Sequence, residues 1–378
     1  MALDLGISIG LFIIFLIVLI GPFKIKIIEQ NLEAFLFVCG AIALTISGFA
    51  VGLEFKGEPI HTGWSLEIVK EGLTAPLKIA DIYGIPIGIV QIVLVVGLII
   101  YKWHEPIHSA IRRMAEKLSF KVMTFILIAV LGLISSVISA IIASIILVEM
   151  ANALPLSRKS KVDLVVIACF SIGLGAALTP LGEPLSTIAV SKLSGPPYYA
   201  GFDYLFNLLG IYIIPGIIAF GIIGMFFIGK ANLNDPGLKA EEYKETLKDV
   251  IMRGVKVYVF IMALVFLGDG FKPIIITYFT QVPSEILYWV NMASAILDNA
   301  TLTAAEIGPY LSEDQIKAIL MGLLISGGML IPGNIPNIIS AGKLRITSKE
   351  WARLGVPLGL ATMAVYFVIL FVPKYIGM

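Results

Sequence analysis

The sequence Ser-Ala-Ile-Leu-Asp-Asn-Ala-Thr-Leu-Thr occupies residues 294–303, and its only acid is Asp298. All other residues from 286 to 305 are uncharged, so this carboxyl group is expected at membrane depth. A charged carboxylate there costs about 2.5–3.5 kcal/mol on insertion scales, and it is retained where it binds a cation, carries a proton or pairs with a buried base. Asn299 and Thr301 add oxygen ligands beside it. We predict a functional ion site, with a structural carboxylate at a helix N-terminus as the alternative.

Composition places this site in a polytopic membrane protein. Of the 378 residues, 58% are hydrophobic and 14% are charged, and the mean hydropathy is +0.97; soluble domains are about 25% charged. The net charge of +1 gives no indication of a nucleic-acid partner, and none is expected. Cys39 and Cys169 lie in apolar runs and are expected to be small core residues, not a disulfide or a metal site. The first apolar run, residues 5–23, is long enough to be a retained span instead of a cleaved signal peptide.

The apolar runs and their polar separators predict five sections of chain. We expect an all-α fold. Continuous spans are predicted over residues 5–23, 34–53, 83–101, 204–229, 257–268 and 354–373, with an amphipathic stretch around 66–77 and an interfacial helix over 104–121. The sections are 1–121, N-terminal scaffold spans and the interfacial helix; 122–229, a first hairpin, broken helix and following span; 230–256, a linker; 257–281, a scaffold span; and 282–378, a second hairpin, broken helix and last span.

The uncharged run 122–148 is long enough to cross once or to enter and return as a re-entrant hairpin. Lys121 precedes it, and Arg158 and Lys159 follow it. Under the positive-inside rule both ends belong in the cytoplasm, which favours the hairpin. Non-helical backbone at its tip is tolerated only where it lines a protein-enclosed cavity. The resulting layout places most of the 27 Lys and Arg residues inside and both termini outside.

Two pairs of segments indicate an internal repeat. Residues 139–144 match 294–299, an offset of 155, and residues 182–193 match 333–344, an offset of 151. Each half is therefore a hairpin followed by a broken helix, and the charge layout inserts the two hairpins from opposite sides. Corresponding helix interruptions in inverted repeats point to a transporter binding site at the bilayer midplane. The predicted helix-breaking residues are Pro180, Gly182, Pro184, Pro332, Gly333 and Pro336.

A broken helix frees carbonyl groups that suit Na⁺ and N–H groups that suit anions. Glu183 lies at the first break and faces Asp298 by pseudo-symmetry. Two acids in one buried cavity disfavour joint ionisation, so such a pair is able to exchange a proton for a cation; in the alternative, Glu183 caps the helix that follows it. We select as cation- and proton-binding residues Asp298, Asn299, Thr301, Glu183, Thr179, Ser186, Ser139, Ser144, Asn334 and Asn337, with Na⁺ on Asp298 and Asn299.

These motifs resemble the ion transporter superfamily, which includes NhaD-type sodium/proton antiporters, ArsB-type arsenite pumps and divalent-anion/sodium symporters. Residues 294–301 resemble the second hairpin tip of the antiporter and arsenite branches, where Ser-Ala-x-x-Asp-Asn is typical. The order of elements is similar over nearly the whole chain, most of all to a prokaryotic family of predicted cation transporters. The first tip departs from the Ser-Asn-Thr of the symporters, because residues 143–146 read Ala-Ser-Ile-Ile. The resemblance implies a homodimer with a scaffold domain and a moving transport domain.

We therefore expect a multi-pass secondary transporter of a prokaryotic plasma membrane, most simply a Na⁺/H⁺ antiporter without a cofactor. A Na⁺-coupled transporter of a small anion is the alternative, although no arginine lies in the cavity segments to clamp a carboxylate. The duplicated hairpins argue against a channel. An intramembrane enzyme is not supported, since the chain has no His-Glu-x-x-His and Asp269 lacks an aspartyl-protease context. The expected partners are the lipid bilayer and an inorganic cation.

Overall fold

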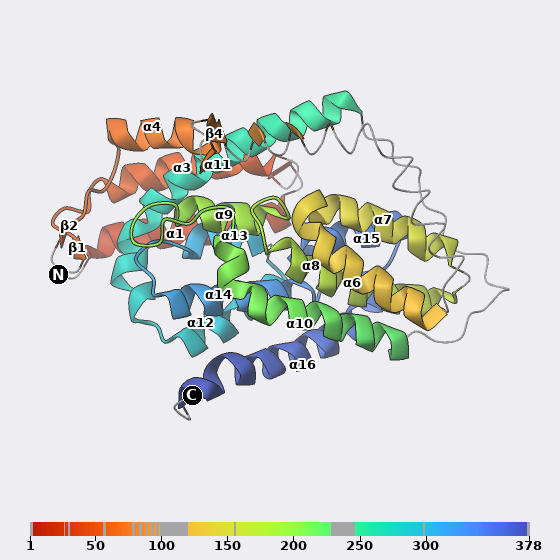
Figure 1. The fold of residues 1–378 in the computed structure, drawn as a ribbon. Helices are drawn as coiled ribbons and strands as arrows, with labels where there is room; N and C mark the ends of the chain where they lie inside the picture. The colour runs from red at the N-terminus through yellow and green to blue at the C-terminus, as the bar shows by residue number, and fades with distance from the viewer. Residues whose placement is uncertain are drawn as a thin grey trace.

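A computed structural model describes most of the chain as α-helices (Figure 1). It describes residues 3–25, 27–28, 31–55, 58–77, 80–82, 85–87, 90–91, 94–95, 98, 120–154, 156–227, 246–297 and 299–375. Both described ends of the chain lie toward the left of Figure 1. Asp298 is outside the described residues, as are most of the expected third span 83–101 and nearly all of the interfacial helix 104–121.

The first half contains eight α-helices among the described residues, together with two short antiparallel strand pairs. In β1–β2, Glu54 lies opposite Pro59, and in β3–β4, Ala80 lies opposite Ile87. The elements are α1 (Leu5–Lys24), α3 (Leu32–Ser47), β1 (Glu54–Phe55), β2 (Glu58–Pro59), α4 (Leu66–Thr74), η1 (Ala75–Leu77), β3 (Ala80–Ile82), β4 (Ile85–Ile87), α6 (Phe120–Ile138), α7 (Ala140–Ala153), α8 (Arg158–Ala176), α9 (Pro184–Lys192) and α10 (Tyr204–Phe227).

The second half alternates long helices with short ones. Its elements are α11 (Leu247–Thr277), η2 (Phe279–Gln281), α12 (Ser284–Val290), η3 (Asn291–Ala295), α13 (Asn299–Glu306), α14 (Glu313–Gly327), η4 (Ile331–Gly333), α15 (Ile335–Leu344) and α16 (Ser348–Tyr375). α11 begins ten residues before the predicted span at 257 and continues past Asp269 to Thr277, because Asp269 and Lys272 form an ion pair one turn apart within the helix. The predicted connector 230–256 is therefore helical from Leu247 onward.

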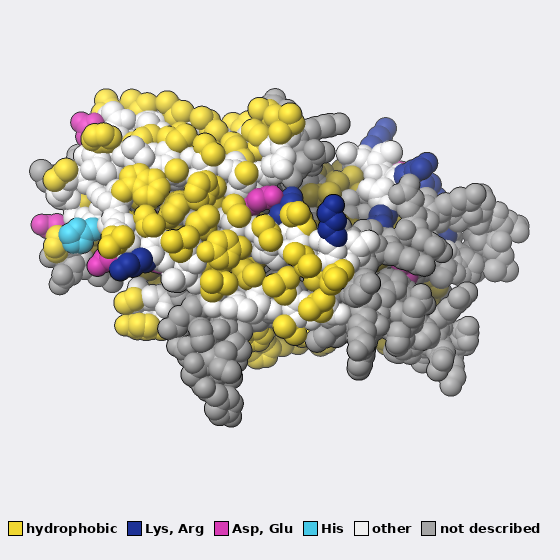
Figure 2. Space-filling model, turned by 90° about the horizontal axis from the view of Figure 1, so that it is seen from above, with side chains coloured by type: hydrophobic (Ala, Val, Ile, Leu, Met, Phe, Trp, Pro, Cys, Tyr) yellow, Lys and Arg dark blue, Asp and Glu magenta, His cyan; other side chains and the backbone are white. Residues whose placement is uncertain are grey.

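Four of the described helices are long and apolar enough to cross a bilayer. They cover Lys121–Ile138, Tyr204–Phe227, Val250–Thr277 and Ser348–Pro373, and shorter apolar helices cover Leu5–Val18, Glu33–Ser47 and Ala140–Asn152. The face over α3, α4 and α11 carries hydrophobic side chains almost throughout, with few charges (Figure 2). A contiguous exposed apolar surface of this extent is unusual in soluble monomers. The fold is that of an all-α membrane protein, as predicted.

Several helices start at side chains that cap their free N–H groups. Asp4 accepts from Gly6 N at 2.9 Å at the start of α1, and Ser65 and Ser157 cap α4 and α8. α14 begins with a capping box, in which Ser312 and Gln315 exchange hydrogen bonds with each other's backbone. Such caps contribute about 1 kcal/mol each. These caps set the residue at which each of these helices begins, because an apolar run alone does not specify it.

The helices pack as two groups that meet along α9 and α13. α1, α3, α4 and α11 pack on one another, and Gly40 of α3 brings two backbones together: a Cβ there would lie 3.0 Å from the carbonyl oxygen of Ala263. The remaining helices contact this group chiefly through α9 and α13, which lie against α11. Small residues at such crossings are typical of helix packing in membranes.

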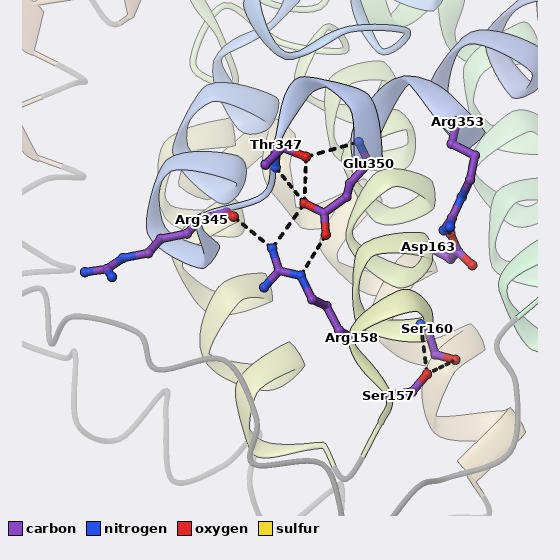
Figure 3. A network of polar contacts seen from close by, with 8 residues as sticks. All are labelled: Ser157, Arg158, Ser160, Asp163, Arg345, Thr347, Glu350 and Arg353. Carbon is purple, nitrogen blue, oxygen red and sulfur yellow. Dashed lines mark hydrogen bonds and ion pairs between the residues drawn. The ribbon is translucent and has the colours of Figure 1, made fainter.

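A polar network joins the start of α8 to the start of α16 (Figure 3). Arg158 donates from Nε to Glu350 Oε1 at 2.7 Å and from Nη2 to Glu350 Oε2 at 3.1 Å and to the carbonyl of Arg345 at 2.9 Å. Glu350 Oε2 also accepts from the backbone and the hydroxyl of Thr347, so it closes a capping box at the first turn of α16. Arg353 donates to Asp163 at 3.1 Å beside it. The two broken helices are thereby tied together at one end of the molecule.

We expect Glu350→Ala to destabilise the protein by about 1–2 kcal/mol. The substitution removes a helix cap worth about 1 kcal/mol and an ion pair that is partly exposed and so worth less than about 1 kcal/mol. Thermal unfolding of the purified protein in detergent measures the change. Lys349→Ala, at the exposed neighbouring position, is the matched control. An equal effect of the two substitutions would contradict the assignment of the cap to Glu350.

Candidate functional site

The first break separates α8 from α9 by the seven residues 177–183. Pro184 occupies the first position of α9, where a missing N–H costs nothing. Glu183 holds the N-cap position with φ −155° and ψ 163°, and its side chain is only 4% exposed. Its carboxylate makes no capping hydrogen bond to α9. The alternative that Glu183 serves as the cap of this helix is therefore wrong, and its burial has another reason.

Side-chain hydroxyl groups donate hydrogen bonds to the backbone carbonyl groups that are freed at the first break. Ser186 Oγ donates to the Ala176 carbonyl, at 3.1 Å, and to the Glu183 carbonyl, at 3.0 Å. Thr187 donates to the carbonyl of Pro180, and Thr179 donates to the carbonyl of Ser136 in α6. Buried backbone carbonyls need such partners, because no water replaces them. The hydroxyl protons of Ser186 and Thr179 thus stabilise the break itself.

The second break separates α14 from α15 and repeats this arrangement. Asn334 is the N-cap residue, with φ −152° and ψ 147°, and Asn337 Nδ2 donates to the carbonyls of Gly327 and Leu330, both at 2.8 Å. The pairs Glu183/Asn334, Ser186/Asn337 and Ala176/Gly327 are each 151 residues apart. The two breaks therefore share one backbone conformation and one hydrogen bond that reaches ten residues back.

Each break touches the turn of the hairpin-like segment that precedes it. Ser139 interrupts the helix between α6 and α7 with a φ of 79°, and Ala140 N donates to the Gly182 carbonyl at 2.7 Å. At the corresponding place in the second half, Gly333 lies so close to Ser294 that a Cβ would be 2.5 Å from the Ser294 carbonyl oxygen. Glycine is required at this position because the backbones of the turn and the break are in contact.

The two halves are interleaved. α7 of the first half packs on α15 of the second, and α13 of the second half packs on α9 of the first. Asn334 lies against Gly173 of α8, and Cys169 of α8 is within 3.5 Å of Ser340 Oγ in α15. The segments selected from the sequence are thus brought to one central, buried region.

Several buried polar atoms without a hydrogen-bond partner among the described residues lie at the second break and at Ser294, which contacts it. They are Ser294 Oγ, both side-chain polar atoms of Asn334 and Asn337 Oδ1, and further such atoms lie elsewhere, on Tyr204, Asn291 and Asn299. Two of these residues converge at Gly327: Asn337 Nδ2 donates to its carbonyl, and a Cβ on Gly327 would lie 3.5 Å from Ser294 Oγ. Unsatisfied buried polar groups cost about 1–3 kcal/mol each unless a water or an ion completes them. A water or an ion bound in this region would complete the hydrogen bonding of these groups.

The other selected residues are distributed around this region. Asn299 and Thr301 are buried in the first turn of α13, and Asn299 also accepts from Thr303 within the helix. Ser144 is buried in α7, where its hydroxyl donates to the Ala140 carbonyl, and Ser139 and Thr179 are half-buried. Ser294 was not selected from the sequence, although its repeat counterpart Ser139 was; matching the two tips residue by residue is the signal that identifies it.

A second acid in α13 has a structural partner. Glu306 is 4% exposed, and its Oε2 accepts from Asn291 Nδ2 at 2.8 Å. Asn291 opens η3, so the bond joins the two arms of the segment that surrounds residue 298. Ser326 of α14 donates to the carbonyl of the same Asn291 at 2.8 Å. Glu306 therefore holds this turn together.

The fold and this buried polar region define a helical membrane protein with two broken helices. The chain belongs to the family described as protein of unknown function DUF1646, whose model matches residues 8–373. No curated protein matches the chain.

We expect Gly333→Ala to destabilise the protein by roughly 1–3 kcal/mol, the usual cost of overpacking. The added methyl group would lie within 3 Å of the Ser294 and Gly327 carbonyl oxygens, which are backbone atoms that have no rotamer to change. Apparent Tm in detergent is the measurement. Gly342→Ala is the control, since a Cβ there meets nothing within 4 Å. A Gly333→Ala protein as stable as wild type would mean that the turn and break are not in contact.

Asn334→Ala and Asn337→Ala should differ in stability when Na⁺ is absent. Asn337→Ala removes the side-chain donor to the buried Gly327 carbonyl, which costs about 1–3 kcal/mol, and leaves the Leu330 carbonyl with the backbone N–H of Gly333 alone. Asn334→Ala removes an amide that has no hydrogen-bond partner in the described part of the chain, so its cost should stay below about 1 kcal/mol. Thermal unfolding in choline buffer compares them. If Asn334→Ala is the more damaging substitution without Na⁺, the Asn334 amide already has a protein partner, and its assignment to a cation site is wrong.

Proposed function

We propose that this protein is a secondary active transporter that exchanges a monovalent cation, Na⁺, for protons across the membrane. The observation that carries the proposal is the group of buried oxygens at the second break that have no hydrogen-bond partner among the described residues, Ser294 Oγ, Asn334 Oδ1 and Asn337 Oδ1. Neutral side-chain oxygens and freed carbonyls are the ligands of Na⁺ in broken-helix transporters. The stretch 294–299 adds Asp298 next to them in sequence.

The two halves act as an inverted repeat of a re-entrant hairpin and a broken helix. In Figure 1, α8 leads leftward into α9, whereas α14 leads rightward into α15. The first hairpin, α6–α7, lies toward the right, and the second, formed by α12, η3 and α13, lies toward the left. The equivalent hydrogen bonds of Ser186 and Asn337 support the same relation. An inverted repeat places the site near the midplane, where alternating access requires it.

The orientation in the membrane follows from the charges at the two ends. Arg158, Arg345 and Arg353 gather at the end drawn in Figure 3. Lys192 and Lys272 lie with Tyr310 at a cavity where α9 ends. The positive-inside rule assigns the arginine-rich end to the cytoplasm, and both termini then face outside in the plasma membrane of a prokaryote.

Exchange of Na⁺ for a proton requires an acid that releases one when it gains the other. Asp298 takes this role, with Glu183 as the second acid of the cavity. Na⁺ favours the ionised carboxylate, and loss of Na⁺ in a water-poor cavity favours the protonated form, because burial disfavours an uncompensated charge. Each carboxyl group can then cross the membrane neutral, either with a proton or with a cation.

One observation favours a second candidate, Na⁺-coupled transport of a small anion. The N-termini of α7, α9, α13 and α15 all lie at the breaks or the hairpin turns. Helix N-termini carry partial positive charge and present free N–H groups to anions. The carboxylate of Glu183 lies at the N-cap of α9, where its negative charge opposes a bound anion, so we rank antiport first.

Proteoliposomes with an internal pH dye test the proposal. Wild-type protein should show proton flux evoked by Na⁺ or Li⁺ but not by choline. Asp298→Asn should abolish it, because an amide cannot carry the proton. Asp203→Asn removes an exposed acid that bonds to Asn207 and should leave the flux intact. Wild-type vesicles with no cation-evoked flux, or full flux in Asp298→Asn, would sink the antiport assignment.

Ligand-dependent stability separates the two candidates. A cation that binds only the folded protein stabilises it by about 2.7 kcal/mol at a hundred times its Kd. For an antiporter, Na⁺ alone should raise the apparent Tm, and more strongly at high pH, where the acids are free to bind it. For the anion transporter, a dicarboxylate or oxyanion should add a further increase that requires Na⁺.

A further inference from the structure

Lys192 is the last residue of α9, and it reaches the end of a second helix. Its Nζ donates to the carbonyls of Ala304 and Ile307, the latter at 3.1 Å, at the C-terminal end of α13. α9 and α13 lie side by side in Figure 1 and pack on each other. One ammonium group therefore serves two helix C-termini, where free carbonyls and partial negative charge both favour a cation.

Both of these helices begin at the central region. α9 starts directly after Glu183, and α13 starts at Asn299, the residue that follows Asp298 in the sequence. They belong to different halves of the chain, and no loop joins them directly. A contact that fixes α13 on α9 at their shared end therefore limits how Asn299 moves relative to Glu183 at the other end.

The neighbouring helix α11 is shaped to admit the Lys192 side chain. Gly268 faces it, and a Cβ at that position would lie 2.9 Å from Lys192 Cε. Lys192 also lines a cavity of about 210 Å³ with Ser191, Ser194, Glu71, Asp269, Lys272 and Tyr310. Asp269 is paired with Lys272 within α11, so the strongest bonds of Lys192 run to α13 and not to a carboxylate.

The cavity holds balanced charge. Lys192 and Lys272 face Glu71 of α4 and Asp269 of α11, and the phenol of Tyr310 contacts Lys272. Burial, reinforced by the neighbouring Asp269 and opposed by Lys272, raises the pKa of Glu71 above its ordinary value. A balanced set of this kind has no surplus charge to hold an added ion, so the cavity is better explained by the docking of Lys192 than by a ligand of its own.

We propose that Lys192 is a positioning residue for the central cation site, acting by clamping the second hairpin arm α13 onto α9. This inference rests on the proposed Na⁺ transport for its functional consequence, but the clamp itself is a property of the fold. The repeat places Lys343 at the equivalent end of α15, which packs on α7.

Lys192→Met tests the clamp without adding volume. Hydrogen exchange of the peptide amides over 299–306 should accelerate at least tenfold, because the carbonyl ends of α13 lose their donor. The apparent KM for Na⁺ in proteoliposomes should rise about tenfold with Vmax within about twofold, since the site is loosened but its acids remain. Lys192→Arg keeps a cationic donor and should recover most of the wild-type KM.

Two further variants keep the test decisive. Gly268→Ala leaves the charge in place but displaces the lysine stem, and it should reproduce the exchange effect if Lys192→Met fails to fold. Lys317→Met is the control, because the ion pairs and the ring contact of Lys317 among the described residues involve Glu313 and Asp314 of its own helix and the ring of Tyr212. Unchanged exchange over 299–306 in both Lys192→Met and Gly268→Ala overturns the clamp. Accelerated exchange with an unchanged Na⁺ KM overturns its link to transport. A wild-type protein without Na⁺ flux overturns the proposed function, and the exchange result still decides the clamp.

Discussion

The structure depends on how backbone groups are satisfied where helices stop inside an apolar interior. A continuous helix bonds every carbonyl to an amide four residues on, but each break at 177–183 and 328–334 leaves carbonyls with no partner and no water to replace it. Side chains further along the sequence supply the missing donors: Ser186 donates to the Ala176 carbonyl, and Asn337 donates to the Gly327 carbonyl. Glycines at 182 and 333 let the returning chain approach the helix end closely enough for these bonds to form.

This shared solution has different consequences in the two halves. At the first break the hydroxyls of Ser186, Thr187 and Thr179 donate to backbone carbonyls. At the second break asparagines replace them, and an amide that donates from its nitrogen still presents an oxygen that needs a partner. Asn337 does this, and Asn334 adds a whole amide without a described partner. The freed carbonyls of the first break are therefore bonded by hydroxyl groups, while the second break keeps side-chain oxygen atoms without a hydrogen-bond partner among the described residues.

Long-range anchoring complements this local chemistry. At one end Arg158 and Glu350 tie α8 to α16, and at the other Lys192 ties α9 to α13. In each case a charged group lies where helix ends from different parts of the chain meet and donates to backbone carbonyls, and Arg158 also pairs with an acid, Glu350. Within one helix group, α3 and α11 pack closely at small residues such as Gly40.

Much of this could be read from local pattern. Apolar runs identified the helices and the membrane class, because burial of 20-residue apolar segments does not depend on their neighbours. The Pro and Gly clusters at 180–184 and 332–336 predicted both interruptions, since closely spaced Pro and Gly residues disfavour a continuous helix, whereas a single proline such as Pro215 is accommodated inside α10. Boundaries were less accurate: α11 extends from 247 to 277 because Asp269 and Lys272 neutralise each other inside it. The expected span over 83–101 lies mostly outside the described residues, and Ile85–Ile87 within it pair as a strand with Ala80–Ile82.

The sequence by itself determined the class of protein, the duplicated break and the identity of most polar residues in the centre, because each of these follows from residues within about ten positions of one another. Only the tertiary structure decided which of those oxygen atoms already form hydrogen bonds within the protein. Whether Glu183 caps its helix, whether Ser294 belongs to the cluster, and which carbonyls Lys192 bonds are settled by contacts between segments more than a hundred residues apart or by the exact path of the chain at a break. No periodicity encodes such contacts, since they arise from how the two halves interleave.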